Sequence, residues 1–252
     1  DRERAPHYIV GEATGDHQFT FKDKEGNRPM DLQIEDIFGN PPKTAMQDED
    51  MQNTFKIPVL DADKIPDYVE DLLQLEAVAC KDWLTNKVDR SVTGRVAKQQ
   101  SCGTIQLPLN NLAVTALDYT GHKGIASSIG HAPAAGIINP AHGSVLSIAE
   151  ALTNIIWAPL EQGIRGVSLS ANWMWPCRHK GEDARLYSAV AAASEFAIAL
   201  GINIPTGKDS LSMTQKYGDG SEVFSPGTVI ISAAAEVNDF RKTVEPAICR
   251  NS

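Results

Sequence analysis

Apolar and polar positions change their pattern twice along this chain of 252 residues. The opening segment, residues 1–45, holds the short mixed runs "HYIVGEAT", "HQFTFKD" and "MDLQIEDIF". The turn "KEGNRP" separates two of these runs, and "GNPP" ends the third. Runs of this length and polarity, bounded by glycine, proline and asparagine, predict edge strands. Because so short a segment does not bury a stable core alone, we expect these strands to belong to a larger sheet.

Residues 46–85 have the pattern of a linker followed by a helix. In "DYVEDLLQLEAV" the apolar positions recur at three-to-five residue intervals, at Val69, Leu72, Leu73 and Val78. This spacing predicts one apolar stripe on an amphipathic helix. Asp67 and Glu70 stand near the start of that helix, where a negative charge suits the helix dipole.

From residue 86 to residue 252 the pattern alternates between strands and helices. The predicted strands lie in "TIQLPLNNLAVTALDY", which supplies two runs, and in "GIASSIG", "GVSLSAN", "INIP" and "GTVIISAAAEV". One predicted helix is "SVLSIAEALTNIIWAPLEQG", with Val145, Ile148, Leu152 and Ile156 on one stripe. The other is "EDARLYSAVAAASEFAIALG", with Gly201 as its C-cap. The order predicts an α+β or α/β layer domain in which two helices cover a sheet.

Composition narrows the class of protein. The formal charge of −9 argues against a general nucleic-acid binder, which neutralises phosphates with clustered Lys and Arg. No run resembles a signal peptide or a membrane span. The cysteines, Cys80, Cys102, Cys177 and Cys249, lie far apart, and the histidines form no zinc-binding pair. We therefore expect a soluble, cytoplasmic protein with reduced thiols and no membrane partner.

The stretch "PTGKDSLSMT", residues 205–214, has the composition of a phosphate-handling loop. It is not a Walker loop, because Ile202 replaces the first glycine and Asp209 follows Lys208 where Ser or Thr is required. It does follow the predicted strand "INIP" and combines Gly207 with Lys208, Asp209, Ser210 and Ser212. A polar loop at a strand end is often a ligand site. Chemistry alone leaves a functional loop and a solvated turn equally open.

In "IAEALTN", Glu150 and Asn154 project from one face of their helix, with Ser147 one turn earlier. A carboxylate and an amide oxygen at this spacing are hard ligands suited to Mg²⁺, although spacing alone favours an exposed polar face.

Two further stretches carry chemical groups. In "SANWMWPC", Asn172 follows a strand, and Trp173 and Trp175 could stack a purine, although tryptophans more often anchor a core. In "VDRSVTGRVAKQQ", Arg90 and Ser91 could meet a phosphate or cap a helix, and the motif does not decide.

Taken together, "DRSVTGRVAKQQ", "IAEALTN", "LSANWMW" and "GKDSLSMT" resemble one family in order and spacing. It is the family of large, single-chain phosphoribosylformylglycinamidine synthases of purine biosynthesis. "RERAPHYIVGEAT" and "DLQIEDIFGNPPK" also resemble it, so the resemblance covers essentially the whole chain. In that family the synthetase region holds two tandem copies of an aminoimidazole-ribonucleotide-synthetase-like unit, each with an N-terminal and a C-terminal half.

The resemblance implies an α+β fragment made of three parts. Residues 1–45 would be the terminal strands of the first copy, 46–85 a linker and helix, and 86–252 the N-terminal half of the second copy. The fold of that half is a mixed sheet covered by helices, whose sheets pair in a dimer. The chain shows no Ser-Glu-His motif, no glycine-rich ATP loop and no Gly-x-Cys-x-Gly glutaminase elbow. We therefore expect the isolated chain to be inactive.

The family's reaction is an ATP-dependent carbon–nitrogen ligation. ATP activates an amide oxygen of formylglycinamide ribonucleotide, and ammonia from glutamine displaces the phosphate. The resemblance assigns Gly207 and Ser210 to nucleotide and substrate contact, with Lys208 and Asp209 between them. It also implies such contacts for the two asparagines Asn172 and Asn110.

The resemblance assigns a second, auxiliary site, in which ATP or ADP and Mg²⁺ are held without turnover. Its metal ligands here would be Glu150, Asn154 and Asn111. The family usually has an Asp at the position of Asn111, and a further Asp comes from the absent C-terminal half. Both departures remove negative charge and predict weak Mg²⁺ binding.

Two rival functions remain at this point. The first is a non-catalytic nucleotide-binding and assembly module of the same enzyme. The second is a selenophosphate-synthetase-like kinase, which would need a catalytic Cys or Lys in a glycine-rich N-terminal tail, and the chain shows none. For the isolated chain we expect a homodimer that buries the sheet surface of "LAVTALDY" and "TVIISAAAEV".

Overall fold

The structure is a computed structural model. It describes residues 5–39, 43, 45–51, 55–76, 78–80, 83, 90 and 92–248. The chain divides into two compact units, residues 1–46 and residues 47–252.

The first unit contains one antiparallel strand pair and one short helix. β1 (Gln18–Phe21) pairs with β2 (Met30–Gln33), and α1 (Ile34–Phe38) follows directly. One of the three predicted strands is wrong, and another is shorter than predicted. "HYIVGEAT" forms no strand, because no neighbouring strand pairs with its backbone and its side chains from Tyr8 to Val10 are exposed. The run "MDLQIEDIF" is divided, because Glu35 and Asp36 place negative charge in the first turn of a helix.

The second unit begins with the predicted amphipathic helix. The short 3₁₀ turn η1 (Ala62–Lys64) leads into α2 (Ile65–Gln74), and Asp61 caps the turn by accepting from the Asp63 N–H at 3.1 Å. The helix ends before the predicted Val78. Its apolar side chains, including Val69 and Leu72, are about half exposed. The apolar stripe thus exists, but its packing partner is not among the described residues.

The main sheet has six strands in the order β3-β4-β5-β10-β6-β7. Their bounds are β3 Val96–Lys98, β4 Leu112–Ala116, β5 Gly124–His131, β6 Ser168–Met174, β7 Asn203–Ser210 and β10 Thr228–Val237. All neighbours are antiparallel except β6 and β7, which are parallel. A separate hairpin consists of β8 (Thr214–Lys216) and β9 (Glu222–Phe224). The sheet is therefore mixed, as the α+β prediction requires.

The region before β4 differs from its prediction. Within "TIQLPLNN" only Leu107 pairs with another segment, in an isolated bridge to Cys102. Pro108 has no N–H for a ladder and follows that bridge directly. The strand next to β4 is instead β3, which the pattern did not indicate.

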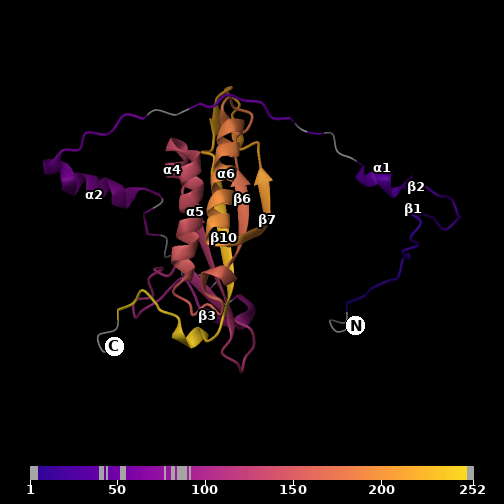
Figure 1. Ribbon diagram of the computed structural model, residues 1–252, viewed down its shortest axis with the longest axis horizontal. Coiled ribbons are helices and arrows are strands. Elements are labelled where there is room, and N and C mark those ends of the chain that lie inside the picture. The colour runs from indigo at the N-terminus through magenta and orange to yellow at the C-terminus, as the bar shows by residue number, and fades with distance from the viewer. Residues whose placement is uncertain are drawn as a thin grey trace. The chain divides into compact units, whose positions relative to one another are not determined.

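Three helices pack against one face of the sheet (Figure 1). They are α4 (Pro133–Ile138), α5 (Pro140–Ile155) and α6 (Glu182–Leu200). The sequence predicted α5 and α6 but missed α4. α5 begins earlier than predicted, because Asn139 caps it by accepting from the His142 N–H at 3.0 Å. α6 ends at Gly201, whose φ of 68° confirms the predicted C-cap. Short 3₁₀ turns are η2 (Val92–Gly94), η3 (Gly163–Gly166) and η4 (Phe240–Lys242).

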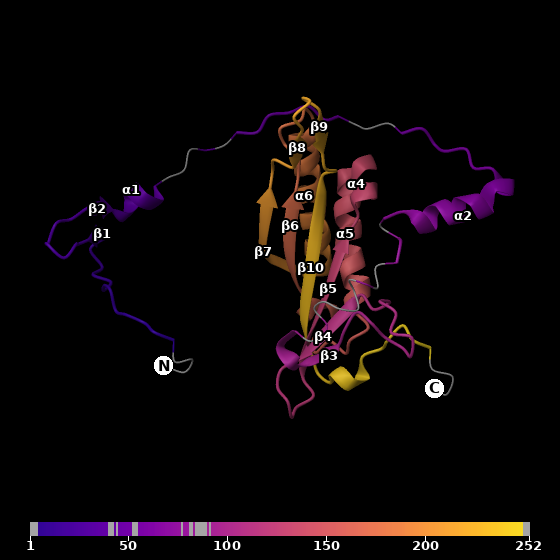
Figure 2. The same ribbon diagram turned by 180° about the vertical axis from the view of Figure 1, so that it is seen from behind.

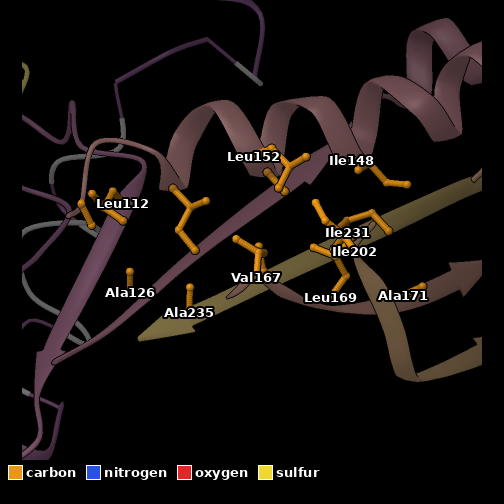
Figure 3. Packing of buried hydrophobic residues seen from close by; sticks show 14 of the residues in the cluster. Leu112, Ala126, Ile148, Leu152, Val167, Leu169, Ala171, Ile202, Ile231 and Ala235 are labelled. Atoms are coloured by element: carbon orange, nitrogen blue, oxygen red, sulfur yellow. The ribbon is translucent and has the colours of Figure 1, made fainter. Parts of the chain in front are cut away.

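The core lies between α5 and the sheet (Figure 3). Ile148 and Leu152 of α5 point toward β-strand residues such as Leu169 and Ile231, and all four are buried. Two of the predicted stripe positions therefore face the core. Ile156 does not: it is the C-cap residue of α5 and is 46% exposed. Ser147, expected on the polar face, is instead buried, and its hydroxyl donates to the Gly143 carbonyl at 2.9 Å.

The opposite face of the sheet is open in this unit (Figure 2). Along β10 the buried positions alternate with the exposed positions Ser232, Ala234 and Glu236. On β5 the exposed positions include Ser127 and Ile129, the latter 58% exposed. Small and hydroxyl side chains thus line this surface, which we call the open face.

Candidate functional site

The stretch "GKDS" lies on β7 and not in a loop, which corrects the prediction for residues 205–210. β7 runs beside β6 in parallel register, pairing Ala171 with Gly207 and Asn172 with Lys208. Polar residues are tolerated in this strand because β7 is the edge of the sheet. Gly207 is required by close approach, since a Cβ there would overlap the Ala171 carbonyl oxygen.

Strand alternation separates the four residues of this motif into two pairs. Lys208 and Ser210 face the same side, and the Lys208 ammonium donates to the Ser210 hydroxyl at 2.7 Å. Thr206, two residues earlier on the same side, lines the open face. Gly207 and Asp209 belong to the opposite side, where Asp209 lies near Cys177. The predicted site therefore contains Lys208 and Ser210 together, whereas Asp209 points away from them.

Asn172 joins the first pair from the neighbouring strand. It is the register partner of Lys208, and both side chains lie on the open side of the sheet. The Asn172 Oδ1 atom is buried and has no hydrogen-bond partner in the structure. A buried acceptor without a partner costs about 1–3 kcal/mol, so it marks a place where a ligand or water donates. Asn172, Lys208 and Ser210 therefore form one polar group at the end of the parallel strand pair.

Glu150 and Asn154 bind the backbone edge of β5. β4 pairs with β5 only as far as Ser128, so the edge of β5 beyond that residue has no strand beside it. Glu150 Oε2 accepts from the His131 N–H at 2.6 Å, and Asn154 Nδ2 donates to the Ile129 carbonyl at 3.1 Å. The two side chains of α5 thus replace the missing strand. One oxygen of each, Glu150 Oε1 and Asn154 Oδ1, is left over for a ligand.

The two asparagines before β4 differ in their use. Asn110 is committed to backbone at both ends of its amide: it donates to the Gln99 carbonyl at 2.9 Å and accepts from the Leu112 N–H at 3.3 Å. Asn111 is exposed. Both line a hollow of about 750 Å³ on the open face, together with Glu150 and Asn154. The structure therefore brings the three residues predicted for the auxiliary site, Glu150, Asn154 and Asn111, to one hollow, together with Asn110, which was predicted as a substrate or nucleotide contact.

Two features of this site were not visible in the sequence. His131 lies beside Glu150, with 3.7 Å between its Nδ1 and Glu150 Oε2. A second hollow of about 270 Å³ adjoins the first at Asn154 and Asn111 and is lined by Trp157, Val244 and Pro246. The Lys98–Glu245 ion pair at 2.5 Å holds that last segment against β3. No local pattern signals a wall that is contributed by residues so far apart.

The remaining candidate side chains are structural. The rings of Trp173 and Trp175 are tilted by 48° with centroids 6.4 Å apart, and Trp175 is 1% exposed. Trp175 is thus a core anchor and does not stack a ligand. Arg90 donates to Gln99 Oε1 at 2.9 Å and to Gln106 Oε1 at 2.7 Å, so glutamines occupy its guanidinium. Its neighbours Asp89 and Ser91 lie outside the described residues.

Cys177 is not an activated thiol. Burial, followed by the hydrogen bond to Asp183 and the nearby carboxylates, raises the pKa of the Cys177 thiol to about 12. It therefore stays protonated at neutral pH and does not act as a nucleophile. Cys80, Cys102 and Cys177 are all free thiols, and Cys249 lies outside the described residues.

Metal and membrane features are limited within the described ranges. No three His, Cys, Asp or Glu side chains come together there in a way that could hold a metal ion. Any metal at the auxiliary site would rely on Glu150 as its sole carboxylate there, supported by the amide oxygens of Asn154 and Asn111. None of the described helices is long and apolar enough to cross a lipid bilayer.

The fold of the chain matches part of PurL from Thermotoga maritima. The structure of PurLQS from that organism aligns with a TM-score of 0.56 over 88% of this chain and 32% of that chain, at 14% identity. T. maritima PurL complexed with FGAR gives 0.51 over 92% of this chain and 32% of that chain, at 12% identity. The complex with ADP gives 0.51 over 87% and 32%, at 14% identity. These likenesses define the fold class, a PurL-type mixed sheet with helices on one face.

Sequence comparison defines the family. The phosphoribosylformylglycinamidine synthase of Dictyostelium discoideum is 39% identical over 258 residues, which are 98% of this chain and 19% of that protein. The chain thus spans about a fifth of the length of this relative. The model of the FGAR-AT PurM_N-like domain matches residues 80–236. The chain belongs to the FGAR-AT PurM_N-like domain family.

Proposed function

We propose that this chain is the part of a phosphoribosylformylglycinamidine synthase that supplies phosphate-binding side chains to an ATP-dependent carbon–nitrogen ligase. Its substrates would be formylglycinamide ribonucleotide, ATP and glutamine-derived ammonia, and its location the cytoplasm. Support comes from the family, from the D. discoideum relative, and from PurL structures in complex with ADP and FGAR. The single observation that carries the proposal is the polar group of Asn172, Lys208 and Ser210 on the open face.

We propose the following division of the chain within the intact enzyme. Residues 1–45 would end the first synthetase-like copy, 46–85 would connect the copies, and 86–252 would form the N-terminal half of the second copy. The isolated chain would then be inactive, because the ATP loop and the glutaminase elbow would belong to other segments of the enzyme.

The chemistry assigned to the polar group is charge stabilisation. As negative charge develops on the transferring phosphoryl group, the Lys208 ammonium supplies the opposite charge and the Ser210 hydroxyl donates a hydrogen bond. These two groups also bond to each other at 2.7 Å, which holds both in place. Asn172 contributes an amide whose buried oxygen lacks a partner and which therefore favours a donor group of the substrate.

The decisive test is Ser210→Ala in the intact enzyme. Removal of one donor to the developing charge should lower kcat by about 100-fold or more, with the melting temperature nearly unchanged. Steady-state kinetics with ammonium as nitrogen donor measures this without the glutaminase. Ser221→Ala is the matched control, because that exposed hydroxyl bonds only to Asp219 in the β8–β9 hairpin loop. If Ser210→Ala retains activity within a factor of two of wild type, the motif has a structural role and does not act in catalysis.

The auxiliary hollow fits a magnesium–nucleotide complex better than a free metal ion. Mg²⁺ is commonly held by one or two carboxylates, nucleotide phosphates and several waters. Glu150 Oε1, Asn154 Oδ1 and an Asn111 amide oxygen meet that requirement only when phosphates complete the shell. The metal would neutralise phosphate charge, while Glu150 and Asn154 would orient it from their backbone-anchored positions.

We expect MgCl₂ alone at millimolar concentration to produce no calorimetric binding signal with this chain. MgADP should produce a signal that falls at least about tenfold in affinity in Asn111→Ala, which removes one oxygen ligand. Asn238→Ala serves as the asparagine control, because Asn238 is exposed and lines neither hollow. Tight binding of Mg²⁺ in the absence of nucleotide would contradict the proposed ligand set.

The rival assembly role has one specific observation in its favour. Glu150 and Asn154 already stabilise the free edge of β5, so they would be needed even if the hollow held nothing. In that case the calorimetric titration would show no binding of MgADP. The effect of Ser210→Ala on catalysis would be unaltered. The two roles are therefore separable by experiment.

We also propose that the isolated chain forms a homodimer through the open face. A two-fold contact buries the same surface of both copies, and small side chains such as Ser127 and Ala234 permit close sheet packing. Ile129→Asp, on the open face, should therefore give a monomer, while Ile198→Asp on α6 should not. Both isoleucines are exposed, at 58% and 75%. Sedimentation equilibrium at micromolar concentration measures the mass, and a wild-type species of only 27.2 kDa would refute the dimer.

A further inference from the structure

The chain beyond β6 and β7 continues as a second, shorter ladder. The Trp175 N–H donates to the Ser210 carbonyl at 2.9 Å, and the Cys177 N–H donates to the Leu211 carbonyl at 3.0 Å. Pro176 and Ser212 form an isolated antiparallel bridge. The Ser210 carbonyl is therefore held by the first residue of the segment that leads from β6 to α6.

The β8–β9 hairpin is joined to the end of this ladder. Thr214, four residues after Ser210, is the first residue of β8 and pairs in register with Phe224, the last residue of β9. The Ser225 N–H then donates to the Met213 carbonyl at 3.1 Å. Residues 211–213 thus connect the base of the hairpin directly to Ser210.

The side chain of His179 contacts both strands at the base of the hairpin. Its Nε2 lies 2.9 Å from the Thr214 hydroxyl oxygen. Its ring stacks on Phe224 with centroids 4.1 Å apart and 25° between the planes. Because Thr214 and Phe224 face each other in register, a single ring fixes both of them to the β6–α6 segment.

We propose that His179 is a positioning residue for Ser210 and Lys208. This inference rests on the proposed function of that pair. The imidazole fixes the hairpin base, the hairpin base fixes residues 211–213, and the ladder with residues 175–177 then sets the placement of Ser210. The Lys208–Ser210 hydrogen bond extends this placement to the ammonium.

The location of His179 separates positioning from general stability. His179 is only partly buried, and β8 and β9 contain no buried residue. Loss of the His179 contacts with Thr214 and Phe224 therefore exposes little buried surface, so the free energy of unfolding changes little. A displacement of about 1 Å at a reacting group, in contrast, can lower a rate by about 100-fold. Loss of the His179 contacts with Thr214 and Phe224 should accordingly lower kcat and leave the melting temperature nearly unchanged.

The test uses three variants of the intact enzyme. His179→Phe keeps the stack on Phe224 and removes the hydrogen bond, and Thr214→Val removes the same bond from the other side. Each should lower kcat by about 10- to 100-fold with the KM for ATP nearly unchanged. Lys216→Met is the control within the hairpin, since it removes only the exposed ion pair with Glu222.

A double-mutant cycle with Ser210→Ala identifies the route of the effect. If His179 acts through Ser210, the combined variant should be no more than a few-fold worse than Ser210→Ala alone. In the 252-residue chain, His179→Phe should also speed hydrogen exchange at the Trp175 and Cys177 amides, with core amides unaffected.

Each result decides the proposal. Multiplicative effects in the cycle, or a His179→Phe enzyme within a factor of two of wild type while Ser210→Ala is impaired, overturn positioning by His179 and leave the proposed function intact. If His179→Phe lowers both kcat and the melting temperature, His179 has a structural role only. If the Ser210→Ala enzyme has normal activity, both the proposed function and this inference are contradicted.

Discussion

Replacement of Arg185 by methionine should destabilise the second unit by about 3–5 kcal/mol, the range for breaking one side of a buried ion pair. Arg185 and Glu182 are among the least exposed charged side chains of the unit, at 6% and 13%, with 3.4 Å between Arg185 Nε and Glu182 Oε1. The Arg185 Nη2 atom also donates to the carbonyls of Gly136 and Ile137 at 2.6 and 2.9 Å. The variant leaves a buried carboxylate and two carbonyls of α4 without this partner.

The size of this loss should depend on pH. Burial raises the pKa of the Glu182 carboxyl above its ordinary value of 4.5, and the charge of Arg185 opposes that rise. Without Arg185 the pKa rises further. A carboxyl with a raised folded-state pKa favours folding while protonated, and this contribution is lost as pH increases through the folded-state pKa. The variant should therefore be most destabilised near neutral pH and should recover part of its stability as the solution is acidified.

Urea unfolding at neutral and at mildly acidic pH measures both effects. Lys123→Met is the matched control, because its ion pair with Glu161 is largely exposed on the lysine side and is worth at most about 1 kcal/mol. Glu182→Gln combined with Arg185→Met should regain stability and lose the pH dependence, since no buried charge remains. Equal losses in Arg185→Met and Lys123→Met would show that Arg185 does not hold α4 to α6.

The spacing of apolar residues predicted the helices that form the core. It failed for some of the strands, because a strand forms only where another segment pairs with it. α5 and α6 have buried positions at helical spacing over three turns or more, so their existence follows from local pattern. "HYIVGEAT" has the composition of a strand but pairs with no strand among the described residues. A strand is defined by its ladder, and a ladder is a property of two segments. β3 was missed for the converse reason: its three residues become a strand only beside β4.

The candidate site was predicted in its residue types and only partly in its geometry. "GKDS" was expected to be a single loop, and its strand conformation places Lys208 and Ser210 on the opposite side from Asp209. The period of two was present in the sequence, but glycine and adjacent charges pointed to a turn. Spacing placed Glu150 and Asn154 on one helix face, and the family resemblance predicted them as ligands. Their bonds to the β5 edge depend on where β4 ends, which no helix pattern contains.

The second large effect should come from Gly130→Ala, a change of one methyl group. Gly130 of β5 lies directly against α5, and a Cβ at this position would overlap the Ser147 carbonyl oxygen and the Ala151 amide nitrogen. Both obstacles are backbone atoms of a packed helix, so they cannot move aside as a flexible side chain would. Core overpacking typically costs about 1–3 kcal/mol, and we expect more than about 3 kcal/mol here because the helix itself must shift.

The consequence of Gly130→Ala should extend to the auxiliary hollow. α5 carries Glu150 and Asn154, whose bonds to His131 and Ile129 flank position 130 on both sides. A helix displaced from β5 loses both bonds, so MgADP binding should fall with stability. Gly218→Ala is the matched control, because nothing lies within 4 Å of a Cβ there and its backbone is not left-handed. Chemical unfolding and nucleotide titration of the two variants measure the difference. A Gly130→Ala chain as stable as Gly218→Ala would show that α5 and β5 do not pack at this distance.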